Sequence, residues 1–264
     1  MEKVLLLQII AHIFADFIFQ PEKWCISKHE KGYRSFKMYW HFGIVLLMSI
    51  IMTFSSSFIL YALIIATLHL LTDLSKSHIE RYIYNKKSTQ SEEKKTYSNH
   101  YIFIFDQLLH LIVIYTCVSL YMCHNAVPFY LEYIDIYHLL IFLCFLLCLK
   151  PANIIIKILL SFLNLPFSPN TKKEEFQENE DLERAGRRIG AIERSLALIL
   201  VLLGQFTAMG FIITAKSILR YNNSPLGKAE YVLIGTLLSF GIAMILGIGI
   251  TKDIFTKILN LISI

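Results

Sequence analysis

Histidine and aspartate residues recur in pairs, four positions apart, in three apolar segments of the 264-residue chain. Residues at this spacing lie on one face of a helix, so each pair can present both side chains to the same site. Imidazole nitrogens and carboxylate oxygens together suit zinc, manganese or iron. The pairs, with one further histidine at the start of another apolar segment, predict a site for one or two divalent ions with the ligands His12, Asp16, His41, His69, Asp73, Asp106 and His110.

The segments that carry these pairs have the length and composition of membrane helices. Hydrophobic residues make up 55% of the chain and charged residues only 17%, and the mean hydropathy is +0.55. These values argue against water-soluble enzymes and secreted disulfide scaffolds. We expect an all-α, polytopic transmembrane helix bundle with one interfacial or re-entrant helix at 151–167 and seven spans near 4–20, 39–55, 58–75, 100–123, 136–149, 191–215 and 229–250.

The distribution of basic residues predicts the orientation of these spans. Most of the 25 Lys and Arg residues fall in the segments 21–40, 75–99 and 150–190, whereas 55–58 and 124–135 contain none. Cytoplasmic loops of membrane proteins are enriched in such residues. We therefore expect a multi-pass protein of the inner membrane, with the N-terminus outside and the C-terminus in the cytoplasm.

The seven-span scheme leaves one basic group out of place. Lys216, Arg220 and Lys228 fall on the outer side, against the general pattern. If Lys216 instead faces the cytoplasm, the number of spans is wrong by one.

The scheme divides the chain into a four-helix module with the His/Asp pocket at 1–123, a fifth span with the interfacial helix and a polar loop at 124–190, and a two-span module at 191–264.

Antiparallel threading aligns the three pairs. The first and third spans run inward and the fourth runs outward, so all three aspartates lie nearer the cytoplasm and their histidine partners about 6 Å deeper. Ionisable side chains in hydrocarbon are costly and usually face a partner or a water-filled cavity. A divalent ion would neutralise the carboxylates. The pairs therefore predict a single pocket that opens toward the cytoplasm.

Several motifs resemble those of a known family. His12-x-x-x-Asp16-x-x-x-Gln20, the His69-x-x-x-Asp73 helix and Asp106-Gln107-x-x-His110 are similar to motifs of a bacterial polytopic membrane family filed as domain of unknown function 3307. The resemblance extends to Gly186-Arg-x-Ile-Gly-x-x-Glu193-Arg194 and covers nearly the whole chain. It implies a bacterial membrane setting and no established activity. More loosely, the chain resembles bacterial membrane-bound metal-dependent hydrolases, which also carry intramembrane His and Asp motifs.

These features favour a metal-dependent hydrolase that acts on a lipid-like or phosphate-bearing substrate at the cytoplasmic leaflet. Asp16 or Asp106 is the candidate catalytic base. The candidate substrate-binding residues belong to the motifs around the pocket or to the basic start of the sixth span, and are Gln20, Lys76, Gln107, Arg187, Glu193 and Arg194.

Two other classes of function remain open. A carrier or sensor of divalent cations or protons would use the same pocket but needs a polar route to the outer face, where these spans are mostly Leu, Ile, Phe and Val. A non-catalytic scaffold would bind a protein partner through the loops 76–99 and 168–190 and use the buried polar residues only for stability. Membrane lipid is an expected partner, and the absence of RNP-like and strand patterns argues against nucleic acid.

Overall fold

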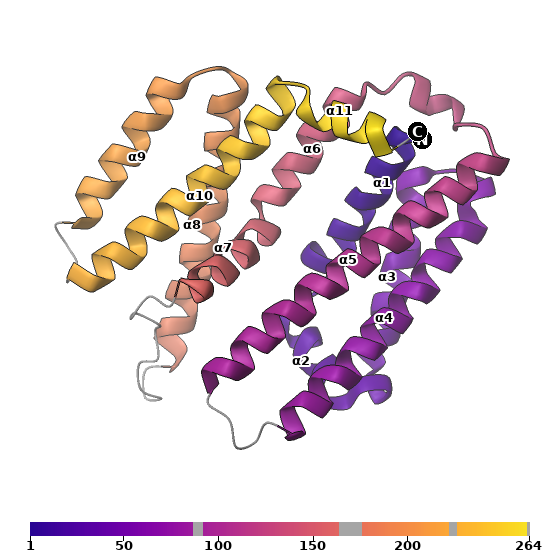
Figure 1. Ribbon diagram of the computed structural model, residues 1–264, viewed down its shortest axis with the longest axis horizontal. Helices are drawn as coiled ribbons and strands as arrows, with labels where there is room; N and C mark the ends of the chain where they lie inside the picture. Colours follow the sequence, from indigo (N-terminus) through magenta and orange to yellow (C-terminus); the bar gives the residue numbers. More distant parts are fainter. Residues whose placement is uncertain (87–91, 164–175, 222–225, 263–264) are drawn as a thin grey trace. The chain divides into compact units, whose positions relative to one another are not determined.

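The chain forms an all-α bundle. A computed structural model describes residues 1–86, 92–163, 176–221 and 226–262, and the regular structure in these ranges is entirely helical (Figure 1). The α-helices are α1 (Glu2–Ile13), α2 (Glu22–Lys31), α3 (Phe36–Thr53), α4 (Ile59–Lys86), α5 (Glu92–His124), α6 (Ile136–Cys148), α7 (Lys150–Phe162), α8 (Phe176–Leu202), α9 (Phe206–Tyr221), α10 (Leu226–Thr251) and α11 (Ile254–Ile262). Short 3-10 turns lie at Gly32–Arg34, Ser56–Phe58 and Phe129–Glu132, and a π-helical turn, η1, covers Phe14–Ile18.

Four stretches of helix are long and apolar enough to cross a membrane. They are Phe36–Thr53, Ser56–Ile83, His100–His124 and Leu233–Thr251. Helices α6 and α7 pass the same test as a pair, but the chain bends by 51° between them, which is the geometry of a broken span or a re-entrant loop. The prediction of an interfacial or re-entrant element at 151–167 falls on this second helix, and residues 164–167 lie outside the described ranges.

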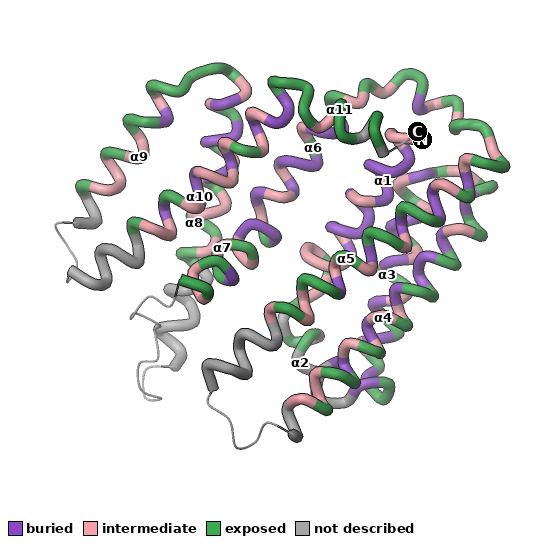
Figure 2. The backbone as a smooth tube through the Cα atoms, viewed as in Figure 1, coloured by how far each residue is buried: buried purple, intermediate pink, exposed green. Residues whose placement is uncertain are grey.

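Many large apolar side chains of the helices are exposed, and several polar and charged side chains are buried beside an apolar core. Large residues such as Leu47, Leu63 and Leu108 are exposed on the faces of the long helices. Figure 2 shows the buried positions on these helices alternating with exposed ones along their length. Since hydrocarbon solvates exposed apolar side chains and water does not, this distribution is the one expected for helices that cross a membrane.

The chain divides into two compact units, Met1–Leu139 and Leu140–Ile262. In the first, α1 packs against α3 and α5, α3 against α4, and α4 against α5, so these four helices close a ring around a common interior. Helix α2 packs against α3 and α4. In the second, α10 packs against α7, α8, α9 and α11. Gly247 permits the close approach of α10 to α8, because a Cβ there would lie 2.5 Å from Val201 Cγ1.

The predicted span at 191–215 is wrong. The helix α8 ends at Leu202, Gly204 has a left-handed φ of +70°, and α9 begins at Phe206. Glycine adopts this conformation without strain, so the chain turns here. The ammonium group of Lys216 donates to Glu193 Oε2, which brings the far end of α9 back to the level of Glu193.

Lys216 therefore lies at the same end of its unit as Glu193, and its predicted place on the opposite side is also wrong. The chain therefore changes direction once more than the seven-span scheme predicts. The misplaced basic residue Lys216 was the sign of this error. The side chains of Arg220 and Lys228 lie outside the described residues. The sequence misled because a glycine inside an apolar run is common in membrane helices and does not by itself indicate a turn.

The two loops predicted to bind a partner are largely helical where the structure describes them. Helix α4 continues to Lys86, α5 begins at Glu92, and α8 begins at Phe176. Lys and Glu are good helix formers, so a charged segment that leaves the membrane can extend a helix. Residues 87–91 and 164–175, in or beside the predicted loops 76–99 and 168–190, lie outside the described residues.

Candidate metal centre

A local irregularity in the first helix positions the first carboxylate. Helix α1 passes into the π-helical turn η1, where Phe19 N donates to Phe14 O at 2.8 Å. π-Helical turns inside α-helices are rare and frequent at functional sites, because the wider turn redirects the side chains within it. Asp16 lies in this turn, with its Oδ1 3.7 Å from Nδ1 of His12.

Three candidate ligand atoms from three different elements lie close together in the first unit. Asp16 Oδ1 lies 3.3 Å from His41 Nε2, on α3, and 3.3 Å from His69 Nε2, on α4. The two histidine nitrogens lie 2.9 Å apart. We call these three residues the ligand triangle. All three side chains are at most 9% exposed.

The ligand triangle contains an acceptor that protein groups do not satisfy. Asp16 Oδ1 is buried and has no hydrogen-bond partner among the described residues. An unsatisfied buried carboxylate oxygen is costly, above all in a membrane. A cation between the three atoms would satisfy the carboxylate and both imidazole lone pairs together.

The dimensions of the ligand triangle suit a first-row divalent ion. With metal–ligand bonds of about 2.0 to 2.1 Å, two ligands of a tetrahedral zinc ion lie about 3.3 to 3.4 Å apart. The observed separations of 2.9, 3.3 and 3.3 Å are close to this value. Three protein ligands and an open fourth position are typical of catalytic zinc sites.

A small cavity adjoins the ligand triangle. It has room for about one water molecule and is lined by polar and apolar side chains of α1, α3, α4 and α5. Among them are His12, His69 and His110, together with Gln8 and Ser49. The cavity gives a bound ion an adjacent space for water or for a substrate atom.

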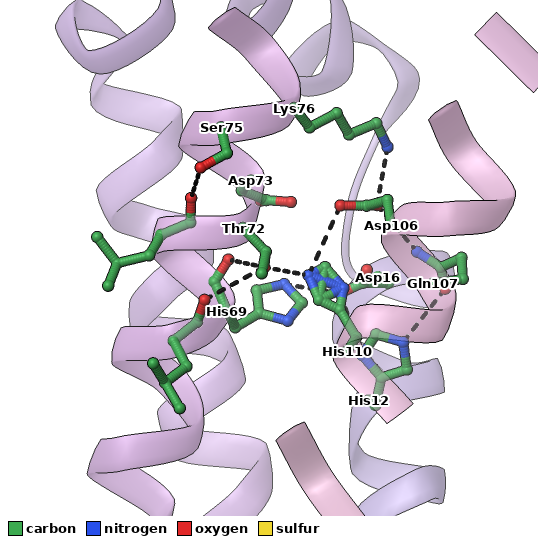
Figure 3. Close-up of polar contacts among 12 residues, drawn as sticks. His12, Asp16, His69, Thr72, Asp73, Ser75, Lys76, Asp106, Gln107 and His110 are labelled. Carbon is green, nitrogen blue, oxygen red and sulfur yellow. Dashed lines mark hydrogen bonds and ion pairs between the residues drawn. The ribbon is translucent and has the colours of Figure 1, made fainter. Parts of the chain in front are cut away.

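Two further histidines lie around the ligand triangle in fixed orientations. The ring of His110 stacks on that of His69 with centroids 3.9 Å apart, and its Nε2 lies 2.7 Å from Thr72 Oγ1. His12 Nε2 lies 3.2 Å from Gln107 Oε1 (Figure 3). One ligand atom from each of His12, Asp16, His69 and His110 fits within 4.8 Å of the others. His12 and His110 are thus further candidate ligands.

The other two predicted carboxylate ligands, Asp73 and Asp106, each form an ion pair with a lysine. Lys28 Nζ, from α2, lies 2.5 Å from Asp73 Oδ2, and Lys76 Nζ lies 3.0 Å from Asp106 Oδ2. Figure 3 shows Lys76 reaching across to Asp106, with Asp73 beside them. Asp73 remains close to the ligand triangle, since its Oδ2 is 3.7 Å from His41 Nε2. The structure therefore brings all seven predicted ligands together but engages two of them with ammonium groups.

Two predicted substrate-binding amides connect these groups. Gln107 Nε2 donates to Asp106 Oδ2 at 3.3 Å while its Oε1 contacts His12. The amide of Gln20, oriented to satisfy its neighbours, accepts from Lys28 Nζ at 2.5 Å and donates to Asp16 O at 3.2 Å. Both glutamines orient residues of the cluster.

The first unit also matches a known family. The family described as "Protein of unknown function (DUF3307)" matches residues 4–139, which is slightly more than half of the chain. The chain belongs to this family. Among curated proteins and solved structures, none matches the chain.

The DUF3307 match ends at the last residue of the first unit, so it contains the whole His/Asp cluster. The predicted resemblance had covered nearly the whole chain, including the Gly186 to Arg194 motif, and that motif lies outside the match. The match gives no support to the looser resemblance to membrane-bound metal-dependent hydrolases.

The predicted substrate-binding residues Arg187, Glu193 and Arg194 lie in the second unit, on α8. Glu193 pairs with Lys216. Arg194 is 2% exposed, and its guanidinium donates to the carbonyl oxygens of Cys148 and Leu149. It therefore holds the bend between α6 and α7.

Sequence reasoning missed a second buried polar group inside the DUF3307 region. Gln8 Nε2 donates to Ser49 O at 3.0 Å and to Thr53 Oγ1, and Ser49 Oγ donates to Gln8 Oε1 at 2.6 Å. Tyr130 donates to Thr53 O. Gln8 stands four residues before His12, so the spacing that revealed the pairs could have revealed it too. Lys28 had no such signal, because it stands among other basic residues of a polar segment.

Proposed function

We propose that the His/Asp cluster binds a divalent ion through Asp16, His41 and His69, and that the protein is a metal-dependent hydrolase of a lipid-like or phosphate-bearing substrate. The observation that supports this proposal is the ligand triangle, with its unsatisfied carboxylate oxygen and its separations of 2.9 to 3.3 Å. Zinc, manganese and iron all accept this mixed set of nitrogen and oxygen ligands.

The proposed reaction uses the open position of the ion. An ion held by Asp16, His41 and His69 would polarise the phosphoryl oxygen and lower the pKa of the attacking water. The water oxygen bonds to phosphorus, the ester P–O bond breaks, and the proton of the water passes by way of a carboxylate to the leaving alcohol. Asp106 is our candidate for that carboxylate, because Asp16 is engaged as a ligand and Asp106 Oδ1 lies 3.9 Å from His110 Nε2.

The test is elemental analysis of the full-length protein, purified in detergent without chelators and then supplied with zinc, manganese or iron. We expect at least one equivalent of ion per chain, and hydrolysis of bis(p-nitrophenyl) phosphate that chelation abolishes and the ion restores. Failure to bind any of the three ions would overturn the proposal. A bound ion without hydrolysis of this ester or of phospholipid vesicles would reject the hydrolase and keep the ion site.

One observation favours a second candidate function, the passage of a cation or protons. The small cavity is lined by three histidines and also by Gln8 and Ser49, and Gln8 donates to Thr53, so buried polar groups continue beyond the His/Asp cluster along α1 and α3. This candidate expects the protein in proteoliposomes to carry the ion or protons across the bilayer, and Gln8→Leu to stop the flux. If proteoliposomes with the wild-type protein pass neither the ion nor protons, this candidate function is rejected.

We also propose the orientation that the loop charges favour, with α2 on the cytoplasmic side and the end of α5 outside. Two native cysteines, Cys25 on α2 and Cys123 near the end of α5, are exposed and report on these two places. A membrane-impermeant maleimide should label Cys123 in spheroplasts and Cys25 only after permeabilisation. Cys123→Ser and Cys25→Ser are the matched controls, and the reverse pattern of labelling would show the opposite orientation.

A further inference from the structure

The two lysines in the His/Asp cluster each pair with a carboxylate that a second metal ion would need. A second site would need Asp73 or Asp106, since Asp16 belongs to the ligand triangle. Each of these carboxylates already accepts a hydrogen bond from an ammonium group, at 2.5 Å from Lys28 and 3.0 Å from Lys76. Hydrogen bonds between two ionised groups are the strongest of their kind.

The two ammonium groups differ in how open they are. The side chain of Lys28 is 8% exposed, whereas that of Lys76 is 24% exposed. Lys76 Nζ also lies 5.2 Å from the ring centre of Phe103, and Phe103 packs edge-on against Phe17. One lysine is therefore enclosed in the cluster, and the other lies at its partly open side beside aromatic rings.

Charge balance decides how many ions the cluster holds. Three carboxylates and two ammonium groups leave one net negative charge when the imidazoles are neutral. One divalent ion changes this to one net positive charge, and two ions would leave three. Uncompensated charge in a buried site is costly, so the cluster with one ion favours a single further anion.

We propose that Lys28 and Lys76 replace a second metal ion, so that the site holds one divalent ion and, beside it, the phosphodiester group of its substrate. This inference rests on the proposed metal site and adds the number of ions and the class of substrate. A phosphodiester carries the one negative charge that the loaded site lacks. Lysine ammonium groups bind phosphate oxygens as point charges.

The first experiment needs no variant. Wild-type protein should bind one equivalent of zinc per chain, and dimethyl phosphate, a soluble phosphodiester, should tighten zinc binding by about tenfold, which is a usual size for coupled sites. Nanodiscs of phosphatidylglycerol should have the same effect if the anion is a lipid head group. If only dimethyl phosphate has it, the substrate is a soluble phosphodiester.

The second experiment removes the ammonium groups. Lys76→Met, alone and combined with Lys28→Met, keeps the length of the side chains, frees the carboxylates and should abolish the effect of dimethyl phosphate. The double variant should take up more than one equivalent of zinc. Lys23→Met is the matched control, because Lys23 is an exposed lysine of α2, and it should behave as the wild type.

The outcomes distinguish a failure of this inference from a failure of the proposed metal site on which it rests. A wild-type protein that binds two ions, or one ion with no response to either source of phosphodiester, would overturn the inference and leave the metal site in place. An unchanged phosphate response in Lys76→Met would overturn it too, even if Lys28→Met does not fold. A protein that binds no ion fails the proposed function itself.

Discussion

Replacing Asp16 by asparagine is expected to weaken divalent-ion binding by more than about 100-fold. Loss of a residue that only supports a metal ligand typically costs 10- to 100-fold in affinity, and Asp16 is itself in the ligand triangle. The amide has nearly the same shape as the carboxylate but carries no charge, so the bundle should still fold. The affinity is measured by competition with a chromophoric chelator, and any hydrolysis should fall with it.

Two further variants make this result specific. Asp135→Asn changes an exposed aspartate outside the cluster and should leave ion affinity unchanged. His41→Gln removes a second member of the ligand triangle, by a different chemical change, and should weaken binding to a similar extent. If Asp16→Asn binds the ion as tightly as the wild-type protein does, Asp16 is not a ligand, and the ligand triangle is not the metal site.

The spacing of the pairs was sufficient to predict the cluster but not its internal division of roles. Helical periodicity fixes which side chains share a face, and antiparallel threading fixes their depth. Which carboxylate meets an ion and which meets a lysine depends on α2, a short polar helix whose Lys28 reaches Asp73 across 45 residues of sequence. The π-helical turn at Asp16 depends likewise on packing that hydropathy does not encode.

The second unit shows the complementary limit of sequence reasoning. The apolar run through 191–215 has the length of a single span, and its break at Gly204 follows from the left-handed φ there. The one sequence signal was the misplaced basic group at Lys216. The ion pair with Glu193 explains that group, because it places both residues at the same level of the unit.

Replacing Arg194 is expected to lower the free energy of unfolding more than any other single substitution in the second unit. Its guanidinium donates to Cys148 O at 2.7 Å, Leu149 O at 3.3 Å, Asn153 Oδ1 at 2.6 Å and Ser239 Oγ at 3.2 Å. The two carbonyls belong to the end of α6, where a helix leaves its last acceptors without partners. Arg194→Met should therefore cost about 3 kcal/mol or more, since each unsatisfied buried acceptor costs about 1 to 3 kcal/mol.

For a chain of this size, that loss corresponds to a fall in Tm of about 6 to 12 °C, measured by circular dichroism of the detergent-solubilised protein. Arg194→Lys keeps the charge but cannot reach four acceptors at once, so it should be destabilised too, whereas Arg188→Met, at an exposed arginine of α8, should not. An anion-binding role for Arg194 predicts a different pattern. Phosphate would then stabilise the wild type more than Arg194→Met, and Arg194→Lys would keep most of that response. A shift in Tm that is equal with and without phosphate would assign Arg194 to the bend between α6 and α7.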